Sequence, residues 1–257
     1  MTKIEWADET WNPITGCTPI SEGCINCYAK RTAKRLAGRY GYPSDNPFRV
    51  TFHEDRLHQP KNWRPRRIFV CSMGDLFHED VADEWIKAVF DTIYRYRHHE
   101  YMILTKRPER LRDMVGDLLR DVYSLANWRE GMLPDHLQIG VTAENQKRAD
   151  ERIPILLQIP AAVRFVSVEP MLGPVAFNHH WFGLCEEGAP CGPHGYVSWV
   201  ICGSETGPKA RPMQLDWAID LKDQCRAADV PFFFKKASKG DIVPEELNIR
   251  EYPGGII

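Results

Sequence analysis

Short apolar runs recur along the chain, and each of them ends in small or polar residues. The runs are rich in Val, Ile and Phe, and continuous runs of this kind are typical of strands that are buried on both faces of a parallel sheet. The runs that we interpret as strands are Trp11–Ile14, Arg67–Ser72, Tyr101–Thr105, Leu137–Thr142, Val163–Val168, Trp199–Cys202 and Pro231–Phe234.

Helical periodicity fills the gaps between these runs, with apolar residues that recur every three to four positions. Because strands and helices alternate, the pattern predicts an α/β fold, and about seven parallel strands favour a complete or partial (βα) barrel in one domain over residues 1–257. We expect a loop insertion at about residues 176–198. The predicted helices are Ala82–Arg97, Pro108–Leu125, Asn145–Leu157 and Leu215–Ala228, and a further helix follows Cys27.

The composition is that of a protein with a sizeable core, since 43% of the 257 residues are hydrophobic. The formal charge of −2 gives no overall attraction to nucleic acid. No apolar run approaches the roughly 20 residues of a membrane span, and the first residues lack the apolar core of a signal peptide. We therefore expect a cytoplasmic protein whose eight cysteines are thiols in a reducing compartment.

Three of the cysteines, Cys17, Cys24 and Cys27, lie close together after the first predicted strand, with the spacing C-x6-C-x2-C. Their loop is rich in Gly, Pro, Ser and Thr, so buried packing explains them poorly, and we interpret them as metal ligands. Three thiolates leave one position of a four-site metal centre open for a substrate or cofactor. Buried packing fits the isolated thiols better, namely Cys71, Cys202 and Cys225.

Polar residues follow nearly every predicted strand, at the carboxyl ends where functional groups collect in parallel α/β folds. Each of them alone is explained as a helix cap or a turn. Together, so many polar groups at one edge of a sheet predict a ligand-binding or active site there. The residues are Ser72, Gly74, Asp75, Lys106, Arg107, Thr142, Glu144, Asn145, Ser167, Glu169, Gly203, Lys235 and Lys236.

Several of these segments, spread over most of the chain, match a known family pattern. The segments are TWNPITGC, GCINCYA, LTKRPERL, GVTAENQ, RFVSVEPMLGP, ICGSETGPKARPM and VPFFFKK. Through them the chain resembles the three-Cys-motif phage protein family, a conserved phage protein of unknown function. That family in turn resembles a divergent branch of the radical S-adenosylmethionine (SAM) enzymes, closest to the spore-photoproduct-lyase-like group. The usual radical SAM spacing is C-x3-C-x2-C, so the first gap is longer in this chain.

The resemblance implies a [4Fe-4S] cluster in which the three thiolates hold three irons and the fourth iron binds the amino and carboxylate groups of SAM. One electron, from a donor such as flavodoxin or ferredoxin, would then cleave SAM to a 5′-deoxyadenosyl radical. By strand position the resemblance assigns the SAM ammonium to Ser72, Gly74 and Asp75, and the SAM carboxylate to Lys106. It assigns the ribose hydroxyls to Thr142, Glu144 and Asn145, or else to Ser167 and Glu169. It assigns the adenine to the backbone near Gly203.

The substrate prediction depends on residues 30–67, which hold eleven Lys and Arg against three Asp and Glu, interleaved with aromatic residues. Such a mixture suits phosphate contacts and base stacking, although long cationic side chains also simply cover helix faces. With the phage-family resemblance, it predicts modification or repair of nucleic acid or a nucleotide. Candidate hydrogen-atom donors in such a reaction are Cys71, Cys202 and Tyr28.

Two other functions remain open on the sequence. One is a non-enzymatic, zinc-stabilised phage module that binds nucleic acid or protein, with His53 or His78 as the fourth ligand. Structural zinc sites more often use two closely spaced ligand pairs, which weakens this interpretation. The other is a metal-free hydrolase, which leaves the cysteine loop unexplained. A second, minor metal site is conceivable at Cys185, Cys191 and His194.

Overall fold

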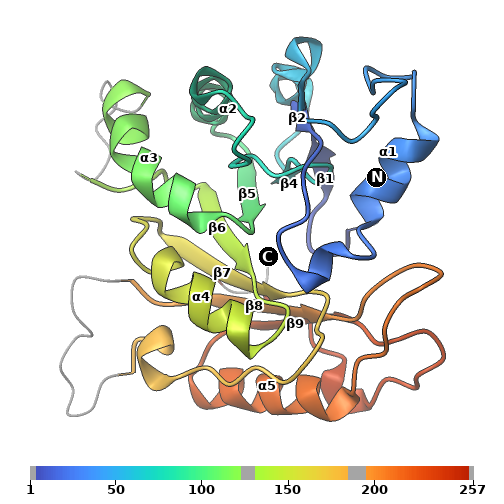
Figure 1. Cartoon of the computed structure of the whole chain (residues 1–257). Coiled ribbons are helices and arrows are strands. Elements are labelled where there is room, and N and C mark those ends of the chain that lie inside the picture. Colours follow the sequence, from blue (N-terminus) through green and yellow to red (C-terminus); the bar gives the residue numbers. More distant parts are fainter. Residues whose placement is uncertain (1–3, 123–130, 185–194, 255–257) are drawn as a thin grey trace.

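The computed structural model describes residues 4–122, 131–184 and 195–254. Within them, seven parallel strands form one sheet that curls into a half-barrel, as predicted, with the order β1-β4-β5-β6-β7-β8-β9 (Figure 1). Spatial order therefore follows chain order, and the carboxyl ends of all seven strands lie at one edge. The strands are β1 (Glu9–Trp11), β4 (Arg67–Val70), β5 (Glu100–Thr105), β6 (Leu137–Thr142), β7 (Val163–Val168), β8 (Trp199–Gly203) and β9 (Phe232–Lys236).

The prediction of a first strand over Trp11–Ile14 is wrong. Strand β1 ends at Trp11, and the chain turns into a separate short strand, β2 (Ile14–Thr15), which pairs antiparallel with β3 (Thr51–Phe52). The physical reason lies in Pro13, which has no amide hydrogen to continue the parallel ladder. After this turn the chain passes the end of β4, where Gly16 forms a bridge with Gly74 at the start of the cysteine loop.

Helices cover the convex face of the sheet (Figure 1). In α2, for example, the buried residues Ile86, Val89, Phe90 and Ile93 have the spacing expected of one helical stripe. The predicted extension of the second helix to Leu125 leaves the described residues after Val122, and the predicted insertion is described only up to Leu184 and again from Gly195. The helices are α1 (Tyr28–Arg35), α2 (Asp83–Arg95), α3 (Pro108–Asp121), α4 (Gln146–Leu156) and α5 (Leu215–Ala227).

Strand residues that alternate with the helix-packed ones form a second apolar cluster, made of strand side chains and the N-terminal segment. Since successive side chains on a strand point to opposite faces, this cluster fills the concave side of the half-barrel. Its buried members are Trp6, Ala7, Phe69, Met102, Phe165, Trp199, Ile201 and Phe233. The concave side is therefore packed at its base, and space is left at the carboxyl ends of the strands. None of the described helices has the length and apolar character needed to cross a membrane.

Candidate active site

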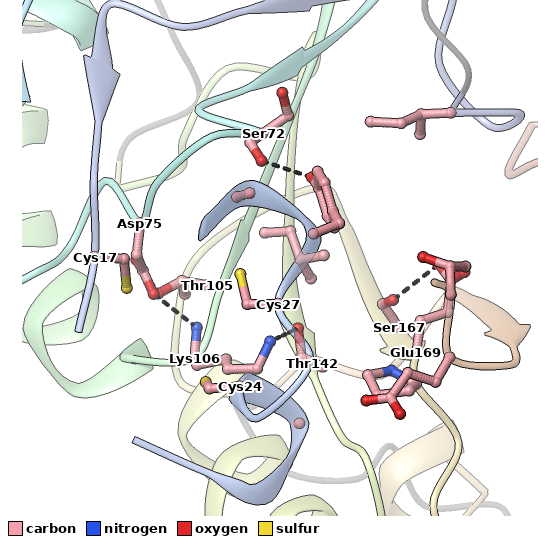
Figure 2. Close-up of a pocket in the computed structure, with 18 of the residues that line it drawn as sticks. Cys17, Cys24, Cys27, Ser72, Asp75, Thr105, Lys106, Thr142, Ser167 and Glu169 are labelled. Atoms are coloured by element: carbon pink, nitrogen blue, oxygen red, sulfur yellow. Dashed lines mark hydrogen bonds between the residues drawn. The ribbon is translucent and has the colours of Figure 1, made fainter. Parts of the chain in front are cut away.

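A cavity of about 220 Å³ opens at the carboxyl ends of the strands (Figure 2). Its lining residues come from the carboxyl ends of all seven strands. Of the residues that the sequence assigned to the cluster or to SAM, Glu144, Asn145 and Gly203 do not line it. Those that do are Cys17, Cys24, Cys27, Ser72, Gly74, Asp75, Lys106, Thr142, Ser167 and Glu169.

The three cysteines reach this cavity from one loop that packs closely on the end of β4. Gly16 has a φ of +92°, and a Cβ at Gly16 would lie 2.1 Å from the carbonyl oxygen of Arg49. A Cβ at Gly74 would in turn lie 2.9 Å from the carbonyl oxygen of Gly16. Position 16 therefore needs glycine because of the Arg49 backbone, and position 74 needs glycine because of the Gly16 backbone. These close contacts place Cys17 at the cavity. Cys24 ends a short 3-10 turn, and Cys27 is the N-cap of α1.

The surroundings of Cys17 and Cys24 shift the pKa values of these two thiols in opposite directions. Burial, followed by the Asp75 carboxylate, raises the pKa of Cys17 to about 12, although the nearby Arg107 opposes the shift. Burial also raises the pKa of Cys24, but the Lys106 ammonium and hydrogen bonds from the loop outweigh it, so the net pKa lies below the usual value. The thiolate is the form that binds metals, so the Lys106 ammonium favours the metal-binding form of Cys24.

Lys106 lines the cavity and brings an ammonium group to it. Its Nζ lies 3.3 Å from Thr142 Oγ1 and 3.8 Å from Glu144 Oε1, and its side chain is 23% exposed (Figure 2). Thr142 ends β6, so the Lys106 side chain reaches from the end of β5 to the end of the neighbouring strand. The side chain is thus fixed at its tip while it still faces the cavity, which suits an anionic group of a ligand.

Asp75 lines the cavity, but its carboxylate already has four donors from the protein. Oδ1 accepts from Thr105 Oγ1 at 2.7 Å and from Phe77 N at 3.0 Å. Oδ2 accepts from Lys106 N at 3.1 Å and from Arg107 Nη1 at 3.4 Å. Asp75 therefore fixes the backbone from which Lys106 projects.

Glu144 lies below the cysteine loop and is fully buried. Its carboxylate accepts from Arg152 Nη1 at 2.8 Å and from Ser21 Oγ at 2.5 Å, and a Cβ at Gly23 would lie 2.3 Å from its Oε1. Glu144 thus anchors the cysteine loop to the end of β6. Its assignment to the SAM ribose stays a prediction that these contacts do not support.

The other two predicted residues outside the cavity also have structural contacts. Asn145 is the N-cap of α4, where its Oδ1 accepts from Arg148 N at 3.1 Å. Gly203 ends β8, and its carbonyl oxygen accepts from Met171 N at 3.0 Å. A Cβ at Gly203 would lie 2.8 Å from Glu169 Oε1, so this glycine makes room for a cavity side chain.

Glu169 forms a second polar centre, on the side of the cavity away from Cys17 and Asp75 (Figure 2). Its Oε1 pairs with Lys235 Nζ at 2.9 Å, and its Oε2 accepts from Trp6 Nε1 and Ser167 Oγ, both at 3.3 Å. The two charged side chains are only 13% and 18% exposed. Such a pair is costly to bury, and its position inside the cavity is typical of a functional group.

The sequence interpretation gave no role to Arg107, although it named the residue beside Lys106. The structure buries Arg107 against the cysteine loop, with its Nη1 3.4 Å from Cys17 Sγ.

One of the three candidate hydrogen-atom donors lies at the cavity, and the other two do not. Tyr28 lines the cavity and donates from its hydroxyl to the carbonyl oxygen of Ser72 at 2.6 Å, whereas the buried Cys71 and Cys202 do not line it.

Among the described residues, no group of three His, Cys, Asp or Glu is arranged to hold a single metal ion. The histidines considered as a fourth zinc ligand are used elsewhere. His53 Nε2 lies 2.8 Å from Thr15 Oγ1, and His78 Nε2 lies 2.8 Å from Thr18 Oγ1. The suggested second site at Cys185, Cys191 and His194 lies outside the described residues.

The fold is similar to that of spore photoproduct lyase, a radical SAM enzyme. A structure of that lyase complexed with dinucleoside spore photoproduct matches with a TM-score of 0.52 and 12% identity, over 88% of this chain and 76% of the other. A cysteine-to-serine mutant of the same lyase matches with a TM-score of 0.48 and 12% identity, over 86% of this chain and 75% of the other. At this identity the likeness concerns the fold. Comparison with curated proteins gives no match.

One family pattern extends over almost the whole chain. It covers residues 1–250, and the family is described as "Protein of unknown function (DUF5131)". The comparisons do not show the three-Cys-motif phage family that the sequence motifs suggested. With a match of this length, the chain belongs to the DUF5131 family.

Proposed function

We propose that this protein is a radical SAM-type enzyme that holds a [4Fe-4S] cluster on Cys17, Cys24 and Cys27 and SAM in the adjoining cavity. The observation that carries the proposal is that three thiols and the Lys106 ammonium line one cavity at the mouth of a half-barrel. When bound, the cluster and SAM would supply the one-electron chemistry that starts a radical reaction.

The donor set fits such a cluster better than it fits a single ion. In a four-iron cluster each thiolate binds a different iron, so the thiols need to face a common space but need not converge on one point. Cys17, Cys24 and Cys27 meet this requirement, since all three are partly buried thiols that line the same cavity. Three thiolates also leave one iron for a cofactor, which a closed zinc site does not offer.

Several residues around the thiols match the polar groups of SAM. We assign Lys106 to its carboxylate, the backbone at Ser72 and Gly74 to its ammonium, and the hydroxyls of Thr142 and Ser167 to its ribose. Asp75 takes part through the residues that its carboxylate fixes, because its oxygens are already bonded to protein donors.

Replacing Lys106 by Ala is expected to keep the cluster and to weaken SAM binding about ten- to a hundredfold. The reason is the loss of one charge-assisted hydrogen bond, which contributes about 1.5–3 kcal/mol. Isothermal calorimetry of the reconstituted protein measures the change. Lys147→Ala is the control, since Lys147 is exposed on α4. Equal SAM affinities of the two variants would remove Lys106 from the site.

The substrate that we propose is nucleic acid or a nucleotide. Helix α1 begins at the cavity with Tyr28 and carries exposed cations along its outer face and the turn that follows, beside Tyr40, which is 75% exposed. The other aromatic residues of the basic segment are packed into the protein, as in the stack of Phe52 on Trp85. The exposed cations are Lys30, Lys34, Arg35 and Arg39.

Replacing these four cations by Gln is expected to weaken binding of a single-stranded oligonucleotide. It should also reduce the slope of log K against log salt by up to about 3, because each phosphate contact to a single strand contributes about 0.7. Fluorescence anisotropy at several salt concentrations gives both values. The control removes the same charge from α2 and α3, at Lys87, Arg95, Arg112 and Arg120. Equal losses in the two variants would mean that α1 has no specific part.

Anaerobic reconstitution with iron and sulfide, followed by electron paramagnetic resonance, tests the proposed function as a whole. We expect a reduced-cluster signal that changes when SAM is added, first with dithionite and then with flavodoxin or ferredoxin as the electron donor. Stoichiometric zinc in the native protein, with no cluster after reconstitution, would instead support a zinc-stabilised binding module.

A further inference from the structure

Arg107 is a buried arginine whose five N–H groups all have an acceptor. Nη1 donates to Cys17 Sγ and to Asp75 Oδ2, both at 3.4 Å. Nη2 donates to the carbonyl oxygen of Thr18 at 3.2 Å and to its Oγ1 at 3.1 Å, and Nε donates to Glu79 Oε2 at 3.0 Å. One side chain therefore joins the end of β5, the loop after β4 and the start of the cysteine loop.

The start of the cysteine loop needs such a connection because it lies far along the chain from the other two thiols. Six residues separate Cys17 from Cys24, whereas only two separate Cys24 from Cys27. Cys24 and Cys27 are held by the 3-10 turn and by the first turn of α1. Cys17 lies in neither element, and its side chain bonds to Arg107 and to the carbonyl oxygen of Thr18.

The guanidinium is also a buried positive charge at a sulfur that would bind iron. Its side chain is 10% exposed, and that of Asp75 is 7% exposed, so solvent screens the charge little. A hydrogen bond to a ligating sulfur and a nearby positive charge both stabilise the more negative, reduced form of an iron–sulfur cluster, which raises its reduction potential.

We propose that Arg107 is a positioning residue for the cluster. It holds Cys17 in place against the two thiols at the other end of the loop, which allows the longer first gap, and its N–H donor favours the reduced cluster. This inference rests on the proposed function. Arg107 also holds Cys17 in the protein without a cluster, so an experiment can separate this inference from the proposed function.

Three variants test the proposal. Arg107→Met removes the positive charge and the hydrogen bonds. Arg107→Lys loses the planar guanidinium but keeps a positive charge beside Asp75. This second variant guards against misfolding caused by an unpaired buried carboxylate. Arg110→Met is the matched control one turn along α3, because the Arg110 guanidinium bonds to the carbonyls of His78 and Val81 and to Asp83.

Amide hydrogen exchange of the protein without iron comes first. Amides of residues 16–24 are expected to exchange about tenfold faster in both Arg107 variants, because a charge-assisted hydrogen bond that holds this segment is lost. In Arg110→Met they are expected to exchange at the wild-type rate. A redox titration of the reconstituted proteins, followed by electron paramagnetic resonance, is expected to give a lower potential in Arg107→Met and a partial recovery in Arg107→Lys.

Wild-type exchange rates in both Arg107 variants would overturn the positioning role. An unchanged potential in Arg107→Met, with full iron content, would overturn the effect on the cluster. If the wild-type protein takes up no cluster while the Arg107 variants exchange faster, the proposed function is wrong and the positioning of Cys17 stands.

Discussion

Replacing any one of Cys17, Cys24 and Cys27 by Ala is expected to abolish the iron–sulfur absorbance of the reconstituted protein. Each thiolate would hold a different iron, so no remaining cysteine of the loop can take over its position. Iron and sulfide contents after anaerobic reconstitution, together with the visible absorbance, measure the loss. The effect should be near complete for each single variant, since two thiolates and SAM would ligate only three of the four irons.

Cys225→Ala provides the control for these variants. Cys225 is a fully buried thiol on α5 and does not line the cavity, so its replacement should keep the cluster. Burial also raises the pKa of Cys225 far above its usual range, which makes it a poor source of thiolate. Full cluster content in all three single variants of the loop would refute the ligand assignment, and with it the radical SAM proposal.

Replacing Glu144 by Gln is expected to lower the free energy of unfolding by about 3–5 kcal/mol, because the Arg152 guanidinium is left without its negative partner in the interior. The two side chains are 0% and 4% exposed, and they lie 2.8 Å apart. Urea denaturation, monitored through the buried tryptophans, measures the change.

Glu151→Gln is the matched control on the same helix. Glu151 pairs with Arg148 at 2.7 Å, but its side chain is 43% exposed, so its loss should cost less than about 1 kcal/mol. Glu144→Gln should also loosen the cysteine loop, because Ser21 donates to the Glu144 carboxylate. Equal stabilities of the two variants would show that the Glu144–Arg152 pair contributes no more than an exposed one.

Most strands and helices of this protein follow from local patterns, the first strand excepted. Strands Leu137–Thr142 and Val163–Val168 begin and end where the predicted runs do, because runs rich in Val, Ile and Phe are typical of strands that are buried on both faces of a parallel sheet. The approximate location of the site follows in the same way. Once the strands are parallel, the residues after them must share one edge, and the structure brings Cys24, Lys106 and Thr142 to one cavity there.

The partners of individual side chains were decided only by the tertiary structure. Thr142 ends β6 and Glu144 comes two positions later, yet Thr142 lines the cavity and Glu144 is buried between the cysteine loop and Arg152. Arg107 gained its role from Cys17, which is ninety positions away in the sequence. A local pattern determines the edge of the sheet at which a residue lies. The direction of its side chain and the charges that it meets depend on segments that are close only in space, and these contacts separate a ligand-facing residue from one that supports the loop.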